Sequence, residues 1–209
     1  MFNWLKKRTP ALEASAPEVL GLRLGGAIEL DDLKFRLIEP ILTIDQVSRI
    51  QIIKAVGEVR LDAQTRLIRF YTDDDGYFQV LQSGINDLDV NEVHLFYFYE
   101  SKPVNTDAVW NDWITNKIVQ PYWNLNGITY EKVWDNTQPV AMTEKTWAED
   151  GSTSTTDQFI MVYERKAGED IFESLLVSGE EIISEYHTEH VIVLSTGIPL
   201  SFTDFTSTG

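Results

Sequence analysis

The stretch "RFYTDDDGYFQVLQ", residues 69–82, decides the fold because it predicts two β-strands joined by a tight turn. Strand-forming residues flank the DDDG segment, and glycine favours the left-handed conformation that closes a three-residue hairpin loop, which we expect at Gly76. This loop length sets Phe70 opposite Val80. It also gathers four apolar side chains on one face of the hairpin: Ile68, Phe70, Phe78 and Val80.

Similar strand patterns lie on both sides of this hairpin, separated by short segments rich in turn residues. They cover residues 28–37, 50–61, 66–72, 77–82, 93–99, 128–134, 158–164, 171–177 and 190–194. Strands at such short intervals favour an antiparallel meander over parallel strand-helix-strand units.

A single helical pattern interrupts the strands in "NTDAVWNDWITNKIVQP", residues 105–121. Its apolar residues recur at helical spacing, and Pro121 ends the pattern because the residue before a proline leaves helical geometry. We therefore predict an α+β fold: a largely antiparallel, bent sheet of β-hairpins with one principal helix near residues 107–119. Residues 17–209 are expected to form one domain, preceded by a flexible basic tail and linker at residues 1–16.

Composition excludes several classes of protein. The 209 residues include 33 acidic and 17 basic side chains, and the resulting formal charge of −16 disfavours nucleic-acid binding. The absence of cysteine removes disulfides and thiolate chemistry and is consistent with a reducing compartment, so we expect a cytoplasmic protein. No apolar run reaches the length of a membrane-spanning helix. No nucleophile elbow or phosphate-binding loop occurs, and we predict no catalytic residue and no cofactor.

Two clusters resemble metal sites without matching their spacing. Asp73 and Asp75 begin like a calcium-binding loop, but the later ligand positions are aromatic or apolar and the closing glutamate is missing. His187 and His190 lie three residues apart, whereas the helical zinc-protease pattern requires four. The sequence predicts no metal site, and it leaves open whether either cluster binds cations.

The tryptophans are the candidate ligand-binding residues. Trp110, Trp113 and Trp123 lie close together in the sequence, and exposed aromatic rings bind sugars, cations or proline-rich peptides. The alternative is that they belong to the hydrophobic core, as aromatic residues at helical spacing commonly do.

The acidic residues near the C-terminus form a candidate docking face for a basic protein partner. No lysine or arginine follows Lys166, whereas this stretch is rich in acids. The predicted face consists of Glu169, Asp170, Glu173, Glu180, Glu181, Glu185 and Glu189. At the opposite end of the chain, the basic segment Lys6–Arg8 beside Trp4 is a candidate for peripheral contact with a membrane or a partner. The leading hypothesis is a non-catalytic interaction or scaffold protein; the alternative is a protein that binds a small ligand or divalent cation, or a carboxylate-based enzyme.

Three segments carry a family resemblance: "GLRLGGAIELDDLKFRLIEP", "AVGEV" and "RFYTDDDGYFQV". They resemble a family of uncharacterised bacterial proteins of the YjfK type. The resemblance implies a cytosolic bacterial protein, and it brings no catalytic residues with it. Members of this family are often encoded near a membrane-binding protein similar to the phage-shock protein A group, which implies a connection with the cell envelope or membrane stress.

Overall fold

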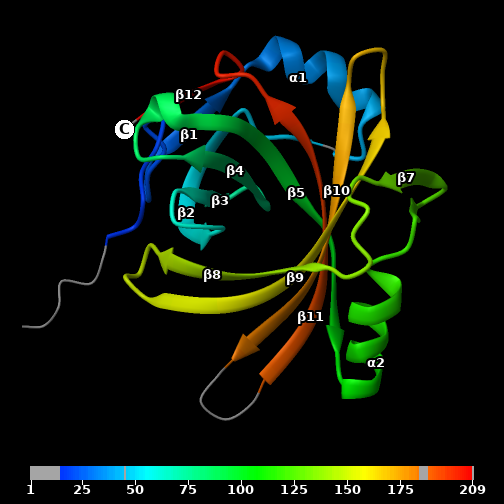
Figure 1. The fold of residues 1–209 in the computed structure, drawn as a ribbon. Coiled ribbons are helices and arrows are strands. Elements are labelled where there is room, and N and C mark those ends of the chain that lie inside the picture. Colours follow the sequence, from blue (N-terminus) through cyan, green and yellow to red (C-terminus); the bar gives the residue numbers. More distant parts are fainter. Residues whose placement is uncertain (1–14, 45, 184–187, 209) are drawn as a thin grey trace, which may run out of the picture.

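The computed structural model describes residues 15–44, 46–183 and 188–208, and its central feature is a closed ring of eight antiparallel strands. Each strand pairs with its two neighbours, and the ring closes where β8 pairs with both β2 and β9 (Figure 1). In order around the ring, the strands are β2 (Ile50–Arg60), β3 (Thr65–Thr72), β4 (Gly76–Ser83), β5 (Val90–Val104), β11 (Thr188–Leu200), β10 (Phe172–Ile183), β9 (Thr153–Lys166) and β8 (Val140–Ala148).

The prediction of an α+β fold with a bent sheet is therefore wrong. The protein is mostly β, its sheet closes into a barrel, and the two α-helices of the described residues are short. The strand that closes the ring, β8, has no counterpart among the predicted strands. Closure supplies each ring strand with two hydrogen-bonding neighbours, which an open bent sheet cannot do at its edges.

A second error concerns residues 28–37, which were predicted to form one strand. The structure has the short strand β1 (Ala27–Leu30) followed by helix α1 (Asp32–Ile38). Asp31 begins the helix because its side chain accepts hydrogen bonds from two backbone N–H groups of the first turn. The helix then buries Phe35 and Ile38, which lie three residues apart, and leaves Leu33 and Leu37 exposed.

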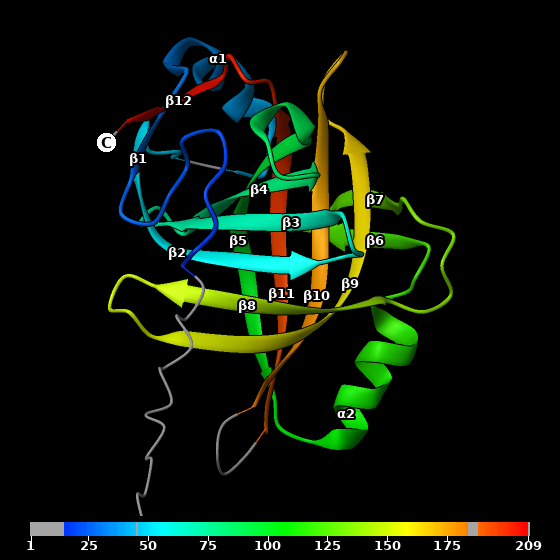
Figure 2. The ribbon, with the colours of Figure 1, turned by 60° about the vertical axis from the view of Figure 1, so that its left-hand side comes forward.

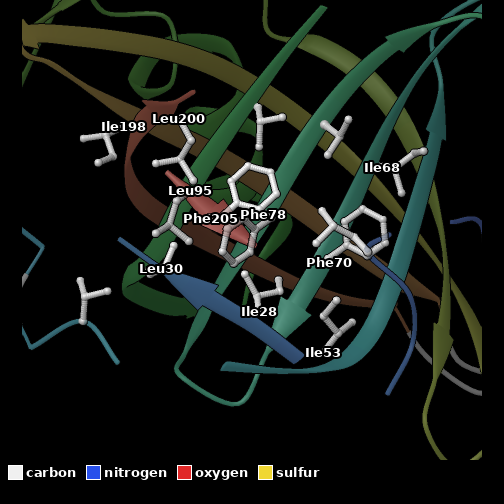
Figure 3. Close-up of a cluster of buried hydrophobic side chains, with 14 of the residues drawn as sticks. Ile28, Leu30, Ile53, Ile68, Phe70, Phe78, Leu95, Ile198, Leu200 and Phe205 are labelled. Atoms are coloured by element: carbon white, nitrogen blue, oxygen red, sulfur yellow. The ribbon is translucent and has the colours of Figure 1, made fainter. Parts of the chain in front are cut away.

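One outer face of the barrel is covered by the N-terminal segment and the C-terminal strand. β1 pairs with β2 on one side and with β12 (Phe205–Thr208) on the other, and α1 continues this cover (Figures 1 and 2). Figure 3 shows the apolar core beneath it, where Ile28, Leu30 and Phe205 of the cover meet Phe70 and Phe78 of the barrel wall.

A second outer face is covered from the opposite side (Figure 2). The cover consists of helix α2 (Asp107–Asp112), the π-helical turn η3 (Trp113–Lys117) and the hairpin of β6 (Tyr122–Leu125) and β7 (Ile128–Lys132). Two shorter 3-10 turns, η1 (Glu39–Ile41) and η2 (Asp87–Asp89), lie in connecting segments. The barrel therefore lies between two apolar cores that are outside its ring.

The DDDG hairpin forms, with details that differ from the prediction. Phe70 pairs with Phe78 instead of Val80, and the left-handed residue is Asp75, with φ +53°, instead of Gly76. A Cβ atom on Gly76 would lie 2.7 Å from the carbonyl oxygen of Phe96, so glycine is needed there for close strand packing. The apolar face predicted for this hairpin is present and belongs to the core in Figure 3.

Candidate functional site

A groove of about 370 Å³ lies between the second cover and the barrel wall, and we call it the tryptophan groove. This volume is within the range of small-molecule and peptide sites. One side is formed by Trp113, Lys117 and Gln120, the other by residues 122–125 of β6, and the floor by Glu100, Lys102, Ile192 and Leu194 of β5 and β11.

The three predicted ligand-binding tryptophans do not share one environment. Trp113 and Trp123 are half-buried, line the groove and face each other with ring centroids 6.0 Å apart. Trp110 is buried and stacks on the ring of His190 at 4.4 Å. The structure thus brings Trp113 and Trp123 together at the surface and places Trp110 in the core.

The π-helical turn η3 positions one side of the groove. The amide of Ile118 donates to the carbonyl of Trp113, five residues earlier, at 2.9 Å, which is the wide turn of a π-helix. π-Helical turns inside α-helices occur frequently at functional sites. Here the turn contains Trp113 and Lys117, whose ammonium lies 4.8 Å from the Trp113 ring centroid.

Several polar groups of the groove have no partner in the described part of the chain. The indole N–H groups of Trp113 and Trp123 and the side-chain amide of Gln120 make no hydrogen bond there. The Asn124 side-chain oxygen accepts from Gly127 at 3.0 Å, which leaves its NH₂ group available. These groups can bond to a ligand that enters the groove.

The barrel interior holds a second cluster, which is ionic and buried. Arg69 Nη1 donates to Glu144 Oε2 and to Gln158 Oε1, both at 2.7 Å, and the Tyr71 hydroxyl donates to Glu144 at 2.7 Å. Gln158 also donates to Glu144 at 2.9 Å and contacts Glu180 at 3.4 Å. The Arg69 and Glu144 side chains are only 4% and 2% exposed, so their charges must be satisfied internally.

Burial and charge shift the pKa values in this cluster in different directions. Burial is the largest single effect on Arg69 and disfavours its charged form, but the Glu144 carboxylate together with Tyr71 and Tyr77 outweighs burial and raises the arginine pKa. Burial raises the pKa of Glu180, against the opposing effect of Arg69. Burial also raises the pKa of Tyr77 to about 12. The cluster therefore keeps Arg69 charged and makes Glu180 a weaker acid than an exposed glutamate.

The predicted acidic face is not assembled as one surface. Glu173 is fully buried, where it accepts hydrogen bonds from Thr43, Tyr130 and Arg165, and Glu180 faces the barrel interior.

The remaining acids of that predicted face divide between the two ends of the β9–β10–β11 strands (Figure 1). Glu169 and Asp170 lie in the turn before β10, roughly 30 Å along the strand from Glu181. Glu181 contacts His190 at 3.1 Å, and Glu189 is exposed at the same end. Glu185 lies outside the described residues.

Of the two clusters that resemble metal sites in the sequence, the aspartates of the DDDG turn hold neighbouring segments in place, and the histidine pair lies partly outside the described residues. Asp73 accepts from the backbone of Ile52, while Asp74 accepts from Ser48 and from the Tyr97 hydroxyl. His187 lies outside the described residues. Across the described ranges, no three His, Asp or Glu side chains gather in an arrangement that could hold a metal ion.

Sequence reasoning missed most of the interior cluster, including Arg69, Tyr71, Glu144 and Gln158. The available signal was the alternation of polar and apolar residues along the strands, which defines two faces. The same alternation is found when the polar face points to solvent, so it did not reveal that these polar side chains face the barrel interior, where they lie beside the apolar cluster of Tyr77, Phe96, Ile160 and Leu176.

No helix in the described ranges has the length and apolar character required to cross a membrane. The basic segment predicted for peripheral contact, residues 6–8, lies outside those ranges.

Comparison with known proteins identifies the family. The chain belongs to the family described as "Protein of unknown function (DUF2491)", whose sequence model matches residues 1–206. It is similar to "Uncharacterized protein YjfK" of Escherichia coli (strain K12), with 31% identity over 190 residues that cover 86% of this chain and 84% of that protein. No solved structure matches the chain. The family resemblance found in the sequence is thereby confirmed, and the family description states no activity.

Proposed function

We propose that this chain is a cytoplasmic, non-catalytic interaction protein whose tryptophan groove binds a segment of a protein partner. The observation that carries the proposal is the composition of the groove. Two half-buried indole rings with available N–H groups border a floor that combines the buried apolar side chains Ile192 and Leu194 with the paired charges of Glu100 and Lys102. Apolar surfaces with a few convergent polar groups are typical of binding sites.

Fluorine NMR of protein labelled with 5-fluorotryptophan tests this proposal. The sequence contains six tryptophans, and single Trp→Phe variants assign each resonance. Pools of blocked dodecapeptides and the neutral sugar maltotriose serve as probes, each added to the full chain. We expect a peptide pool to shift the resonances of Trp113 and Trp123 and to leave Trp147 unchanged, because Trp147 is not among the groove residues. If no peptide pool shifts the two groove signals selectively, the proposal is wrong.

A basic partner is favoured by the charge of the protein. The formal charge of −16 attracts cationic segments over a distance of about one Debye length and speeds their encounter. The surface acids at the end of the barrel near Asp157, Glu181 and Glu189 offer a second contact area for such a partner. Raising the salt concentration should slow association with a Lys-flanked peptide and leave the rate for an uncharged peptide nearly constant.

A further inference from the structure

We propose that the partner segment binds as an extended strand that pairs with the free edge of β6, with uncharged residues in the groove and basic residues on both sides. This inference rests on the proposed function and adds the conformation and chemistry of the segment. Four observations support it: the order of the strands in the sheet, the direction of the β6 backbone groups, the side chains that cover the faces of the two indole rings, and the charge of the groove.

β6 is the last strand of the sheet in the described residues. It pairs with β7, and its other edge has no neighbouring strand in this part of the chain. The same strand forms one side of the tryptophan groove. An extended peptide that enters the groove therefore meets an unpaired strand edge, which is the arrangement required for strand addition.

The turn between β6 and β7 shows which backbone groups face this edge. Asn126 and Gly127 both have positive φ, +48° and +87°, as in a two-residue type I′ hairpin turn. Leu125 and Ile128 then form the hydrogen-bonded pair next to the turn, and pairs alternate along an antiparallel ladder. Tyr122 and Asn124 consequently direct their backbone N–H and C=O groups away from β7. These groups make no hydrogen bond to the described residues.

The faces of the two indole rings in the groove are already covered by other side chains, which favours a peptide strand over a stacked sugar as the ligand. Lys117 lies over the Trp113 ring, and the Trp113 and Trp123 rings pack against each other at an interplanar angle of 30°. Trp123 also contacts the ring of Tyr163 at 5.7 Å. A sugar needs an open aromatic face, whereas a strand uses the backbone edge together with the ring edges.

The charges define the side chains of the segment. Within and beside the groove, Lys102 pairs with Glu100 at 2.7 Å and Lys117 pairs with Asp112 at 3.1 Å, so the local charges balance. The centre of the segment is therefore uncharged. Outside the groove the protein is strongly acidic, which favours lysine or arginine on both flanks of the segment.

Peptides selected from a random twelve-residue phage library on the immobilised full chain provide the probe. Each selected peptide is resynthesised with one backbone N-methyl group at a time, and its dissociation constant is measured. Strand pairing predicts that N-methylation weakens binding at every second residue, by roughly tenfold for each lost hydrogen bond, and has little effect at the residues between.

A pair of protein variants tests the same contact from the other side. Asn124→Pro removes the outward N–H of β6, and Asn124→Ala removes only the side-chain amide. We expect the proline variant to bind the peptide about tenfold more weakly than the alanine variant. Circular dichroism and the urea midpoint verify that both variants fold. If the proline variant does not fold, the N-methylated peptides still test strand pairing on the natural protein.

Three outcomes contradict the inference in distinguishable ways. A selected peptide that shifts Trp113 and Trp123 but tolerates N-methylation at all positions removes strand pairing and leaves the groove as a binding site. Selective shifts with maltotriose and none with peptides identify a sugar site, which removes both proposals. Selected peptides that are acidic at both ends contradict the charge argument.

Discussion

The buried ion pair between Arg69 and Glu144 makes the sharpest prediction about stability. The two side chains are almost completely buried, and Glu144 accepts hydrogen bonds from Arg69, Tyr71 and Gln158 at 2.7–2.9 Å. Glu144→Gln keeps the shape of the side chain but removes the carboxylate that pairs with the Arg69 guanidinium at 2.7 Å. Removing one partner of a buried pair costs about 3–5 kcal/mol, and we expect this loss in the free energy of unfolding.

A double-mutant cycle separates the pair from its surroundings. Arg69→Met should also cost about 3–5 kcal/mol because it leaves the Glu144 carboxylate buried without its cation. The double variant Arg69→Met/Glu144→Gln combines the two substitutions, removes both charges and should lose less than the sum of the two single variants. The difference measures the coupling between the two side chains.

Urea unfolding at pH 7, followed by far-UV circular dichroism and tryptophan fluorescence, provides the free energies. Arg60→Met is a matched control, because Arg60 is 73% exposed and pairs with Glu58 at 3.4 Å, so its loss should stay within about 1 kcal/mol. Strictly additive losses, or a loss below about 1 kcal/mol for Glu144→Gln, would refute the reasoning.

Three further predictions concern other residues of the barrel strands. Gly57→Ala should lower the free energy of unfolding by about 3 kcal/mol or more, because the new Cβ would lie 1.7 Å from Glu144 Oε1 and displace that carboxylate. Urea unfolding measures this loss, and an unchanged free energy would contradict the prediction. Burial raises the pKa of Glu180, so the free energy of unfolding should fall as pH rises through the folded-state pKa of this side chain. Glu180→Gln should therefore be more stable than the natural chain at pH 8, and the difference should disappear toward pH 4. A constant difference in stability across this pH range would exclude the mechanism. Glu173→Gln leaves Arg165 without its carboxylate at 2.6 Å and should cost roughly 3 kcal/mol, whereas a surface docking role for Glu173 predicts almost no change in the urea midpoint.

The placement of Glu173 and Glu180 changes the interpretation of the charge of this protein. Both belong to the C-terminal acidic stretch that suggested a docking face, yet one joins the N-terminal cover to the barrel and the other faces the barrel interior. The net charge still favours a basic partner. In our proposal such a partner binds at the groove and the unpaired edge of β6, and not on a continuous acidic surface.

Local signals in the sequence were sufficient for several features. The hairpin at residues 69–82 and the helical segment that begins near Asp107 depend on turn residues, caps and periodicities within about 15 residues. Thr106 caps that helix, because its hydroxyl accepts a hydrogen bond from the amide of Val109. Net charge, the absence of cysteine and the family resemblance also came from the sequence alone.

Closure of the barrel was decided only in three dimensions. β8, "VAMTEKTWA", pairs with β2 far earlier in the chain and with β9 next to it, and neither partner can be identified from the pattern of β8 itself. Arg69 finds Glu144 and Gln158 at sequence separations of 75 and 89 residues. An alternating strand pattern defines two faces, but only closure of the ring decides which face is the interior. Burial becomes favourable for the polar face because closure brings its distant hydrogen-bonding partners within reach.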